Sequence, residues 1–454
     1  MKFMAYFLVG WLIPSVGMAS SGLATTPGLE LFGIPFDFIL FACTLIGVAL
    51  FHHHTMKVAL TGLSVIIIYK LIFTGFKHGT GVMGLALHFE HEWVILTNLL
   101  CLLLGFALLA NHFEESKLPD ILPKFLPSGW MGGFSLLALI FFMSAILDNI
   151  AAALIGGTIA GIVFHKKVHI GFLAAIVAAS NAGGAGSVVG DTTTTMMWIA
   201  GISPLAVIHA FVGSFAALAI FGIPAAIMQH KYSPLTENAV TDIKIDWHRV
   251  GIVFFILISA ISVNVLVNVA FADYSDSFPF LGATVWVCLI LAALVRQPHW
   301  SLLPDAMKGS IFLLSLVVCA SLMPVEKLPV ASWFSAMMLG FISAVFDNIP
   351  LTALAIKQGG YDWGVLAYAV GFGGSMIWFG SSAGVAISNL FPEAKSVAAW
   401  VRHGWFVIVA YVIGFFVMLG LMGWHPTHTK VEIVAETPVH HVSEKEHDAL
   451  REKN

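Results

Sequence analysis

The sequence predicts an all-α polytopic membrane protein, built from two inverted repeats that each contain a re-entrant hairpin and a broken helix. Composition is the first observation: 59% of the 454 residues are hydrophobic and 10% are charged, against about 25% charged residues in a soluble domain. The mean hydropathy is +0.92, and a soluble core of this length could not bury so much apolar surface. The bilayer must therefore be the solvent. The other two observations are a series of apolar runs and a pattern of interruptions that occurs twice.

The apolar runs have the lengths that membrane-crossing helices need. A helix of about 20 residues spans the hydrocarbon core, so the shorter runs also require their flanks. Four further regions, 129–164, 168–199, 329–357 and 361–390, are longer or are interrupted by Gly, Pro and polar residues. The predicted single spans are 3–18, 34–51, 56–75, 94–110, 203–228, 249–270, 280–295, 309–323 and 404–423.

The two ends of the chain differ from the middle. Met1 and Lys2 precede an apolar run to Pro14, which fits either a short first membrane helix or a cleaved signal peptide. From about His425 to Asn454 the chain is charged and has no apolar period, so a solvated, disordered tail is expected. No basic patch with interleaved aromatic residues occurs, which argues against a nucleic-acid partner. The four cysteines are far apart and form no CxxC pair, so no disulfide or metal site is predicted from them.

The interruptions of the apolar regions occur twice in the same order. Residues 144–150 read Ser-Ala-Ile-Leu-Asp-Asn-Ile, and residues 343–349 read Ser-Ala-Val-Phe-Asp-Asn-Ile. A Gly-Gly pair follows each motif, beginning at Gly183 in the first half and at Gly373 in the second. Paired, Gly-interrupted segments in matching halves are the sequence feature that best indicates a transporter binding site.

Basic residues predict which loops are cytoplasmic, because Lys and Arg collect on that side of a membrane. Lys117 and Lys124 precede the first hairpin and Lys166 and Lys167 follow it, so this hairpin would begin and end inside. The loop 230–249 is basic and would also lie inside. The loop 271–276 is acidic and would lie outside, while Arg296 and Lys308 would lie inside. The next crossing then puts both ends of the second hairpin on the outer side. The two hairpins then have opposite sense, as an inverted repeat requires. On the same count the C-terminal tail lies outside the cytoplasm.

These features divide the chain into five parts. Two repeat cores, each with a hairpin and a broken helix, alternate with stretches of scaffold helices. The parts are 1–115 (N-terminal scaffold helices), 116–228 (first core), 229–323 (loop and scaffold helices), 324–424 (second core and last helix) and 425–454 (polar tail).

Three carboxylates, Asp148, Asp191 and Asp347, lie deep in the interrupted apolar regions. A charge at this depth is costly and indicates function by default. No Lys or Arg occurs in the central motifs, so a proton or a bound cation must neutralise the acids. A carboxylate in a low-dielectric cavity holds a proton more tightly, and competition between a proton and sodium at that carboxylate is exchange. We expect Asp148 and Asp347 to face each other near the midplane, with Asp191 joining them.

Neutral oxygen donors surround these acids in the sequence. Hard cations such as sodium prefer oxygen ligands, and broken helices leave backbone carbonyls unpaired. The same residues could instead only cap broken helices, and the positive N-terminal ends of half-helices could favour an anion. The predicted cation and proton ligands are Asp148, Asn149, Asp191, Asp347, Asn348, Asn181, Thr193, Thr194, Ser144, Ser343, Ser375 and Ser381, with the three aspartates as hypothesised sodium ligands. Further oxygen donors nearby are Thr192, Thr195, Thr352 and Ser382.

These motifs resemble those of the NhaD-type sodium/proton antiporters, within a wider ion transporter superfamily that includes citrate and arsenite carriers. The resemblance covers about 130–390 and rests on the segments 144–149, 181–194, 343–350 and 373–385. It implies a scaffold domain, a mobile transport domain with elevator-like alternating access, a homodimer and a place in the bacterial inner membrane. One departure is the stretch 186–189 (Gly-Ser-Val-Val), where the family often has Trp-Ser-Pro. By position the resemblance points to Ser144, Asp148, Asn149, Asn181, Asp191, Thr193, Thr194, Ser343, Asp347 and Asn348 as functional residues.

The predicted function is a secondary transporter that exchanges sodium or lithium for protons, with lipid and small inorganic ions as partners and no cofactor. The alternative is a sodium- or proton-coupled carrier of an anion such as a carboxylate or oxyanion, although the acids of both Asp-Asn motifs would repel that substrate. An intramembrane aspartyl protease is disfavoured. Such enzymes share Tyr-Asp and Gly-x-Gly-Asp motifs, whereas Leu147 and Phe346 precede two of these acids and Val188 replaces the first Gly. A channel is disfavoured because nothing resembles a selectivity filter.

Overall fold

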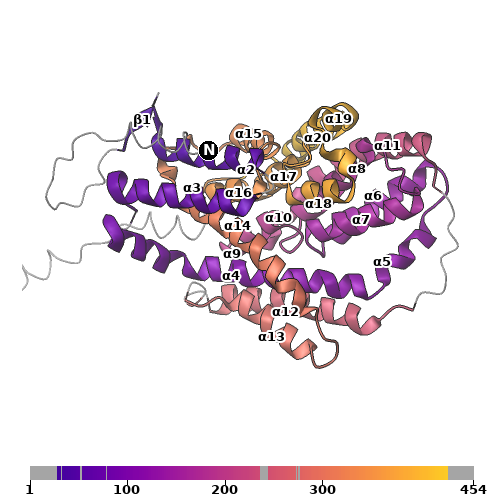
Figure 1. Cartoon of the computed structure of the whole chain (residues 1–454), viewed down its shortest axis with the longest axis horizontal. Coiled ribbons are helices and arrows are strands. Elements are labelled where there is room, and N and C mark those ends of the chain that lie inside the picture. Colours follow the sequence, from indigo (N-terminus) through magenta and orange to yellow (C-terminus); the bar gives the residue numbers. More distant parts are fainter. Residues whose placement is uncertain are drawn as a thin grey trace, which may run out of the picture.

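The computed structural model describes residues 28–427 apart from 32, 52–53, 78, 236–243, 272–273 and 275–276. The first predicted span, 3–18, and the tail from 428 onward therefore lie outside the described residues. Almost all of the described secondary structure is helical (Figure 1), as the composition predicts. The exception is a two-stranded antiparallel hairpin of β1 (Glu30–Leu31) and β2 (Ile34–Pro35), which precedes the first described helix.

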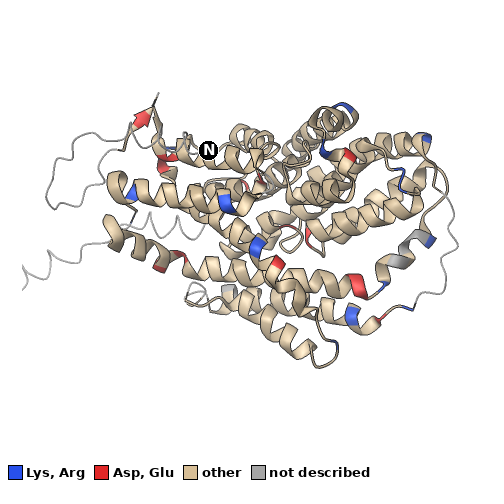
Figure 2. Cartoon of the chain, viewed as in Figure 1, with Lys and Arg blue, Asp and Glu red and all other residues tan. Residues whose placement is uncertain are grey.

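The long helices follow the predicted apolar runs. They are α2 (Phe36–Leu50), α3 (Thr55–Tyr69) with a π-helical turn at Lys70–Thr74, α4 (Gly81–Glu115), α11 (Ala210–Tyr232), α12 (Trp247–Ala270), α13 (Phe280–Ala292), α14 (Leu303–Ser321) and α20 (Trp405–Met422). Six helical stretches in the described part of the chain are long and apolar enough to cross a membrane: Thr55–Thr74, Gly81–Glu115, Pro204–Tyr232, Trp247–Val267, Trp300–Ser321 and Trp405–Met422. Figure 2 shows long uncharged stretches along most helices. The protein is a multi-pass, all-α membrane protein.

Helix α4 is longer than its apolar run indicates. It has 35 residues and begins at Gly81, whereas the run begins at 94. The added turns carry His88 and Glu92, both of which are buried. Glu92 forms an ion pair with Lys357 of a distant helix, and a ring nitrogen of His88 lies 3.0 Å from Ser321 Oγ. Polar residues can continue this helix because tertiary partners compensate them.

The first core unit contains four helices that are too short to span the membrane alone. The hairpin consists of α6 (Trp130–Ser144) and α7 (Asn149–Val163), and the broken helix consists of α8 (Ile170–Ala185) and α9 (Thr192–Ile199). A helix of 15 residues is about 22 Å long, less than the hydrocarbon thickness of about 30 Å. Non-helical backbone at this depth requires burial within protein. The residues between α8 and α9, 186–191, are almost all buried.

The second core unit has the same order of elements. Its hairpin consists of α15 (Trp333–Ser343) and α16 (Asn348–Gln358), and its broken helix consists of α17 (Trp363–Gly373) and α18 (Ser382–Leu390). The remaining short helices are α5 (Leu118–Ile121), α10 (Pro204–Ile208) and α19 (Val397–His403), and short 3-10 turns lie at 122–125, 300–302, 325–327 and 392–395.

The centre of the molecule lies around α8 and α17. All of α8 after Ile170 is buried, and all of α17 is buried. Their sequences are rich in Gly and Ala, which let helix backbones approach closely in a membrane protein. Helix α8 packs against α6, α7, α11 and α17, so the two broken helices contact each other in the middle of the fold. Figure 1 shows α17 between the α2–α3 pair and the α6–α7 hairpin, and α8 beside that hairpin.

A second group of helices packs against one side of the two core units. Helix α4 contacts α12, α13 and α14, while α14 also contacts α3. The group meets the core units through α14 against α16 and α4 against α9. The break residues of both core units therefore lie near a wall made by α4 and α14.

Charged residues join the end of α4 to the start of α12. Asp246 caps α12 and accepts a hydrogen bond from Arg296 Nε at 2.8 Å, and Arg249 forms an ion pair with Glu115 at 2.7 Å. The Arg296 guanidinium beside Asp246 lowers the pKa of that carboxyl. Arg249 ends the basic loop that the sequence predicts to be cytoplasmic, so this end of the bundle corresponds to the predicted cytoplasmic side.

The start of the predicted tail is ordered. Residues 425–427 belong to the described part, and the N–H of His425 donates to Asp362 at 2.9 Å. The N–H of Thr427 donates to the carbonyl of Tyr361 at 3.1 Å. The first residues of the predicted polar tail therefore bond to the fold.

Candidate functional site

Both Asp-Asn motifs make the same local structure. Asp148 is the N-cap of α7 and accepts from the N–H of Ile150 at 3.1 Å. Asp347 is the N-cap of α16 and accepts from the N–H of Ile349 at 3.1 Å. Each carboxylate compensates the positive end of a half-helix. The structure therefore confirms the capping role at Asp148 and Asp347. The hydrogen bond of each cap fixes the position of its carboxylate at the start of the half-helix.

The second break of each core unit is also capped by a polar side chain. Asp191 begins α9 and accepts from the N–H of Thr193 at 2.9 Å, while Ser381 begins α18 and accepts from the N–H of Gly384 at 3.3 Å. The caps therefore begin four half-helices, and the residues at these four N-termini line one cavity. Three of the four caps are carboxylates.

Asp191 receives hydrogen bonds from both core units. Asn149 Nδ2 donates to Asp191 Oδ2 at 3.0 Å and to Asn181 Oδ1 at 3.0 Å. Asn348 Nδ2, from the second unit, lies 3.5 Å from the same Asp191 oxygen. The Asp191 charge also interacts with the charges of Asp148 and Asp347. A carboxylate that is 2% exposed thus connects the two Asp-Asn motifs.

The amide of Asn181 extends this network into the second core unit. Its Nδ2 donates to Ser375 Oγ at 2.9 Å and to Ser381 Oγ at 3.0 Å. All three residues are almost fully buried. The network therefore fixes the breaks of the two units against each other.

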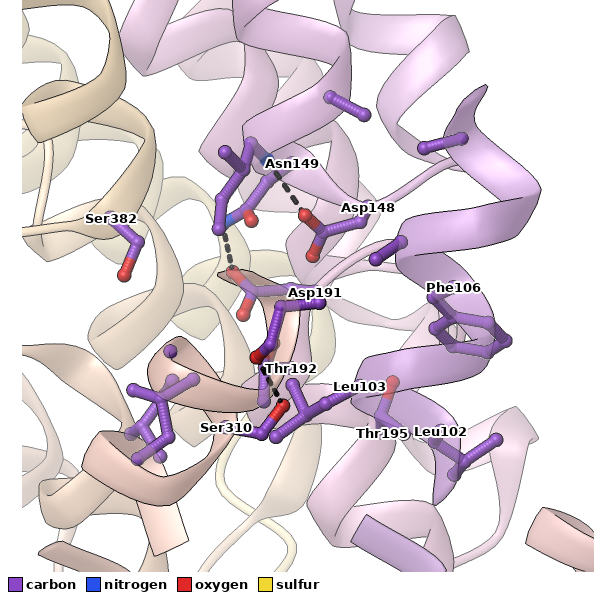
Figure 3. A pocket seen from close by; sticks show the side chains of 18 of the residues that line it. Leu102, Leu103, Phe106, Asp148, Asn149, Asp191, Thr192, Thr195, Ser310 and Ser382 are labelled. Atoms are coloured by element: carbon purple, nitrogen blue, oxygen red, sulfur yellow. Dashed lines mark hydrogen bonds between the residues drawn. The ribbon is translucent and has the colours of Figure 1, made fainter. Parts of the chain in front are cut away.

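The site opens into a cavity of about 330 Å³ between the core units and the wall of α4 and α14 (Figure 3). Its apolar side is made mainly by α4, with Leu99, Leu102, Leu103 and Phe106 among its residues. Its polar lining consists of Asp148, Asn149, Asp191, Thr192, Thr195, Ser310, Asn348 and Ser382. None of the ion pairs formed by described residues involves Asp148, Asp191 or Asp347.

The known proteins that the chain resembles are all named as sodium/proton antiporters. Sodium/proton antiporter 2 of Arabidopsis thaliana is 24% identical over 339 residues, which are 63% of this chain and 73% of that protein. Sodium/proton antiporter 1 of the same plant is 27% identical over 63% of this chain but only 53% of its own length. The Na+/H+ antiporter NhaD of Vibrio cholerae is 24% identical over 75% of this chain and 81% of that protein. The chain is related to the NhaD-type sodium/proton antiporters.

No protein-family model matches the chain. The relatives are named as antiporters, which are transporters and not enzymes.

The predicted ligands fall into two groups in the structure. Asp148, Asn149, Asp191 and Asn348 line the cavity. Asn181, Ser375 and Ser381 lie behind them in the amide network. Asp347 is not among the cavity-lining residues, and its second carboxylate oxygen accepts from Ser382 Oγ at 3.3 Å.

Three predicted hydroxyl ligands bind backbone carbonyls. Ser144 Oγ donates to the carbonyl of Ser180 at 2.6 Å, and Ser343 Oγ donates to that of Val370 at 2.9 Å. Thr194 Oγ1 donates to the carbonyl of Ser187 at 2.6 Å. These hydroxyls tie each break to its neighbours. Thr193 contributes its backbone N–H to Asp191.

The three acids do not form one ligand cluster. In the described part of the chain, no three His, Cys, Asp or Glu side chains come together as metal ligands. The charges of Asp148 and Asp347 both act on Asp191, and the expectation that Asp148 and Asp347 face each other stays a prediction. The cavity thus offers carboxylate oxygens together with amide and hydroxyl groups, and no cluster of carboxylates.

Sequence reasoning missed Ser310 of α14. It lies in an apolar run of the scaffold, far from either repeated motif. No periodic or repeated signal distinguishes it from other serines of the same helix. Its place in the cavity is visible only in three dimensions.

Proposed function

We propose that this protein is a secondary active transporter that exchanges sodium, or lithium, for protons across a membrane. The observation that carries the proposal is Asp191, a buried carboxylate bonded by amides of both core units and exposed to a cavity. No basic side chain among the described residues pairs with it, so its charge calls for a proton or a cation. The curated relatives bear the names of sodium/proton antiporters.

Exchange follows from competition at this carboxylate. Asp191 can hold either a proton or a cation, because one negative charge needs only one positive partner. The Asn149 and Asn348 amides donate to the same oxygen, Oδ2, and keep it in place when the partner changes. A cation gains oxygen ligands from hydroxyl and carbonyl groups around the cavity, whereas a proton needs none of them.

Asp148 and Asp347 are proposed to tune this competition. Both acids interact electrostatically with Asp191, and each remains attached to the first turn of a half-helix. A negative charge near Asp191 attracts cations of either kind into the site. Asp148 lines the cavity, so it is the acid that an entering cation meets together with Asp191.

We further propose the inverted-repeat architecture and the division into parts 1–115, 116–228, 229–323, 324–424 and 425–454. Matching contacts in the two core units support it. Ser144 bonds the carbonyl of Ser180, and at the corresponding positions Ser343 bonds the carbonyl of Val370. The core units would move against the scaffold helices in an elevator-like manner, within a homodimer in the bacterial inner membrane.

The cavity supports a cytoplasm-facing state. It is lined by the C-terminal half of α4 and the N-terminal half of α14. Those halves lie toward the end of the bundle that holds Glu115, Arg249 and Arg296, where basic residues favour the cytoplasmic side. Transport to the other side requires the core units to carry Asp191 away from this opening.

Nothing in the site favours the anion alternative. A carboxylate or oxyanion entering this cavity would meet Asp148 and Asp191, and no Lys or Arg lines it. The positive ends of the half-helices are already compensated by their aspartate caps.

The test is proton flux in proteoliposomes, read with a pH-sensitive dye after addition of sodium, lithium, potassium or citrate. Sodium should drive proton movement with the native chain but not with Asp191→Asn. Asp362→Asn is the matched control, because Asp362 is also a buried N-cap aspartate of a core helix but lies outside the cavity. Citrate uptake without a cation response would overturn the proposal, as would full sodium-driven flux in Asp191→Asn.

A further inference from the structure

The wall that α4 and α14 contribute to the cavity is almost entirely apolar. From α4 it contains leucine, phenylalanine and alanine side chains only, and from α14 it contains Ala306, Gly309, Ser310 and Leu313. Ser310 is therefore the one polar side chain on this wall among the described residues. The facing lining, from the two core units, carries the acids and amides.

The hydroxyl of Ser310 is oriented by its own helix. Its Oγ donates to the carbonyl of Ala306 at 2.9 Å, and the residue is 3% exposed. A serine hydroxyl has one hydrogen and two lone pairs. Since the hydrogen is committed to the α14 backbone, the oxygen can offer only lone pairs to the cavity. In this arrangement the group is suited to coordinate a cation.

The surface of α14 beside Ser310 is open. A Cβ atom placed on Gly309 would meet nothing within 4 Å, and Gly309 also lines the cavity. An ion with part of its water shell can therefore approach this turn of α14. Without Ser310, the wall would give that ion no ligand at all, and the ion would depend on water on this side.

We propose that Ser310 is a cation-contacting, affinity-determining residue on the α14 wall, opposite the acids of the core units. The inference rests on the proposed function, because it concerns the same ion and the same cavity. Since α14 lies outside both core units, the contact exists only while the core units face this wall. Ser310 therefore acts on ion binding from one side of the membrane and not from the other.

Ser315 offers a matched control on the same helix. It is 5% exposed, and its Oγ donates to the carbonyl of Ile311 at 2.7 Å, the same bond to the fourth preceding residue. Ser315 does not line the cavity. Replacing either serine by alanine removes the same internal hydrogen bond, so only a role toward the ion distinguishes them.

The experiment compares the native chain with Ser310→Ala, Ser310→Thr and Ser315→Ala in oriented vesicles, titrating sodium separately on each face. We expect Ser310→Ala to raise the sodium concentration for half-maximal exchange by about three- to tenfold on one face, with the maximal rate within about twofold. Ser310→Thr keeps an oxygen and should stay within about twofold of native, as should Ser315→Ala.

The outcomes separate two failures. If the native chain shows no sodium-driven proton flux, the proposed function itself fails. If it shows that flux but Ser310→Ala behaves as Ser315→Ala, or shifts both faces equally, Ser310 has no contact with the ion and the inference is overturned. Loss of affinity in Ser310→Thr equal to that in Ser310→Ala would also overturn it, because the hydroxyl would then be irrelevant.

Discussion

The two core units share their backbone contacts but not their charges. A Cβ on Gly183 would lie 2.0 Å from the carbonyl oxygen of Phe141, and one on Gly373 would lie 2.3 Å from that of Gly340, at corresponding positions. The charges diverge at the second break, where Asp191 of the first unit corresponds to Ser381 of the second. The repeated glycine contacts therefore belong to the packing of the two units. The position at which the units differ holds Asp191, the group that we propose binds the ion.

The largest expected effect comes from the two positions at which the units differ. Asp191→Asn should reduce sodium-driven proton flux by roughly a hundredfold or more, because the central charge is lost. Ser381→Ala removes one acceptor of the Asn181 amide and the side-chain cap of α18, but no charge, and should cost less than about tenfold. Flux measured at saturating sodium checks both, and equal effects would contradict the asymmetry.

The close glycine contacts should be equally intolerant in both units. Gly183→Ala and Gly373→Ala each force a backbone carbonyl aside, so each should destabilise the fold by about 2–3 kcal/mol. Gly251→Ala is the control, since a Cβ there meets nothing within 4 Å and alanine favours a helix. Thermal unfolding in detergent measures all three. A strong effect at only one of Gly183 and Gly373 would show that the two units do not depend equally on these close backbone contacts.

The two Asp-Asn motifs provide a finer comparison. Asp148 lines the cavity, whereas Asp347 accepts from Ser382 and is not part of the lining. Asp148→Asn should therefore lower exchange by about ten- to thirtyfold and Asp347→Asn by about threefold. Asparagine retains the cap in both cases. Initial rates over a range of sodium concentrations test the ranking, and the reverse order would place the ion nearer the second hairpin.

The smallest expected effect concerns a charge that only the second hairpin has. Lys357 of α16 pairs with Glu92 of α4, and the corresponding residue of α7 is Thr158. Glu92→Gln should cost about 1 kcal/mol in stability, less than a fully buried pair, because 22% of the Lys357 side chain is exposed.

Glu92→Lys alone places two positive charges together and should destabilise the fold. The double exchange, Glu92→Lys with Lys357→Glu, restores opposite charges and should recover most of the stability that Glu92→Lys loses. Unfolding temperature is the readout, with the exposed pair of Asp305 and Lys308 as a control site. A double exchange no more stable than Glu92→Lys alone would mean that the two charges do not interact.

Much of this frame could be predicted from residue patterns. The duplicated Asp-Asn and Gly-Gly motifs, within apolar regions, indicate the breaks and the buried acids, and the apolar runs indicate the spans. The sequence could not predict that α4 begins as early as Gly81. Glu92 lies in the added turns, and its charge is compensated by Lys357, a residue far away in the sequence.

The detailed roles of hydroxyl groups were also beyond sequence reasoning. Ser144 and Ser343 are conspicuous in the repeated motifs, yet their hydrogens bind backbone carbonyls. Ser310 carries no motif, yet it lines the cavity. Residue type says that an oxygen is present, but only the packing of helices decides where that oxygen faces. Asp191 emerged as the connecting acid for the same reason, since its two amide donors come from different halves of the chain.

The volume of the cavity has a consequence for ion selection. At about 30 Å³ per molecule, a cavity of about 330 Å³ has room for on the order of ten waters. A small cation can therefore enter with its first hydration shell and need not be stripped at the mouth. Dehydration then happens at the polar floor, where each lost water can be replaced at once by a protein oxygen. Under the proposed exchange at Asp191, discrimination between ions then depends on their hydration energies.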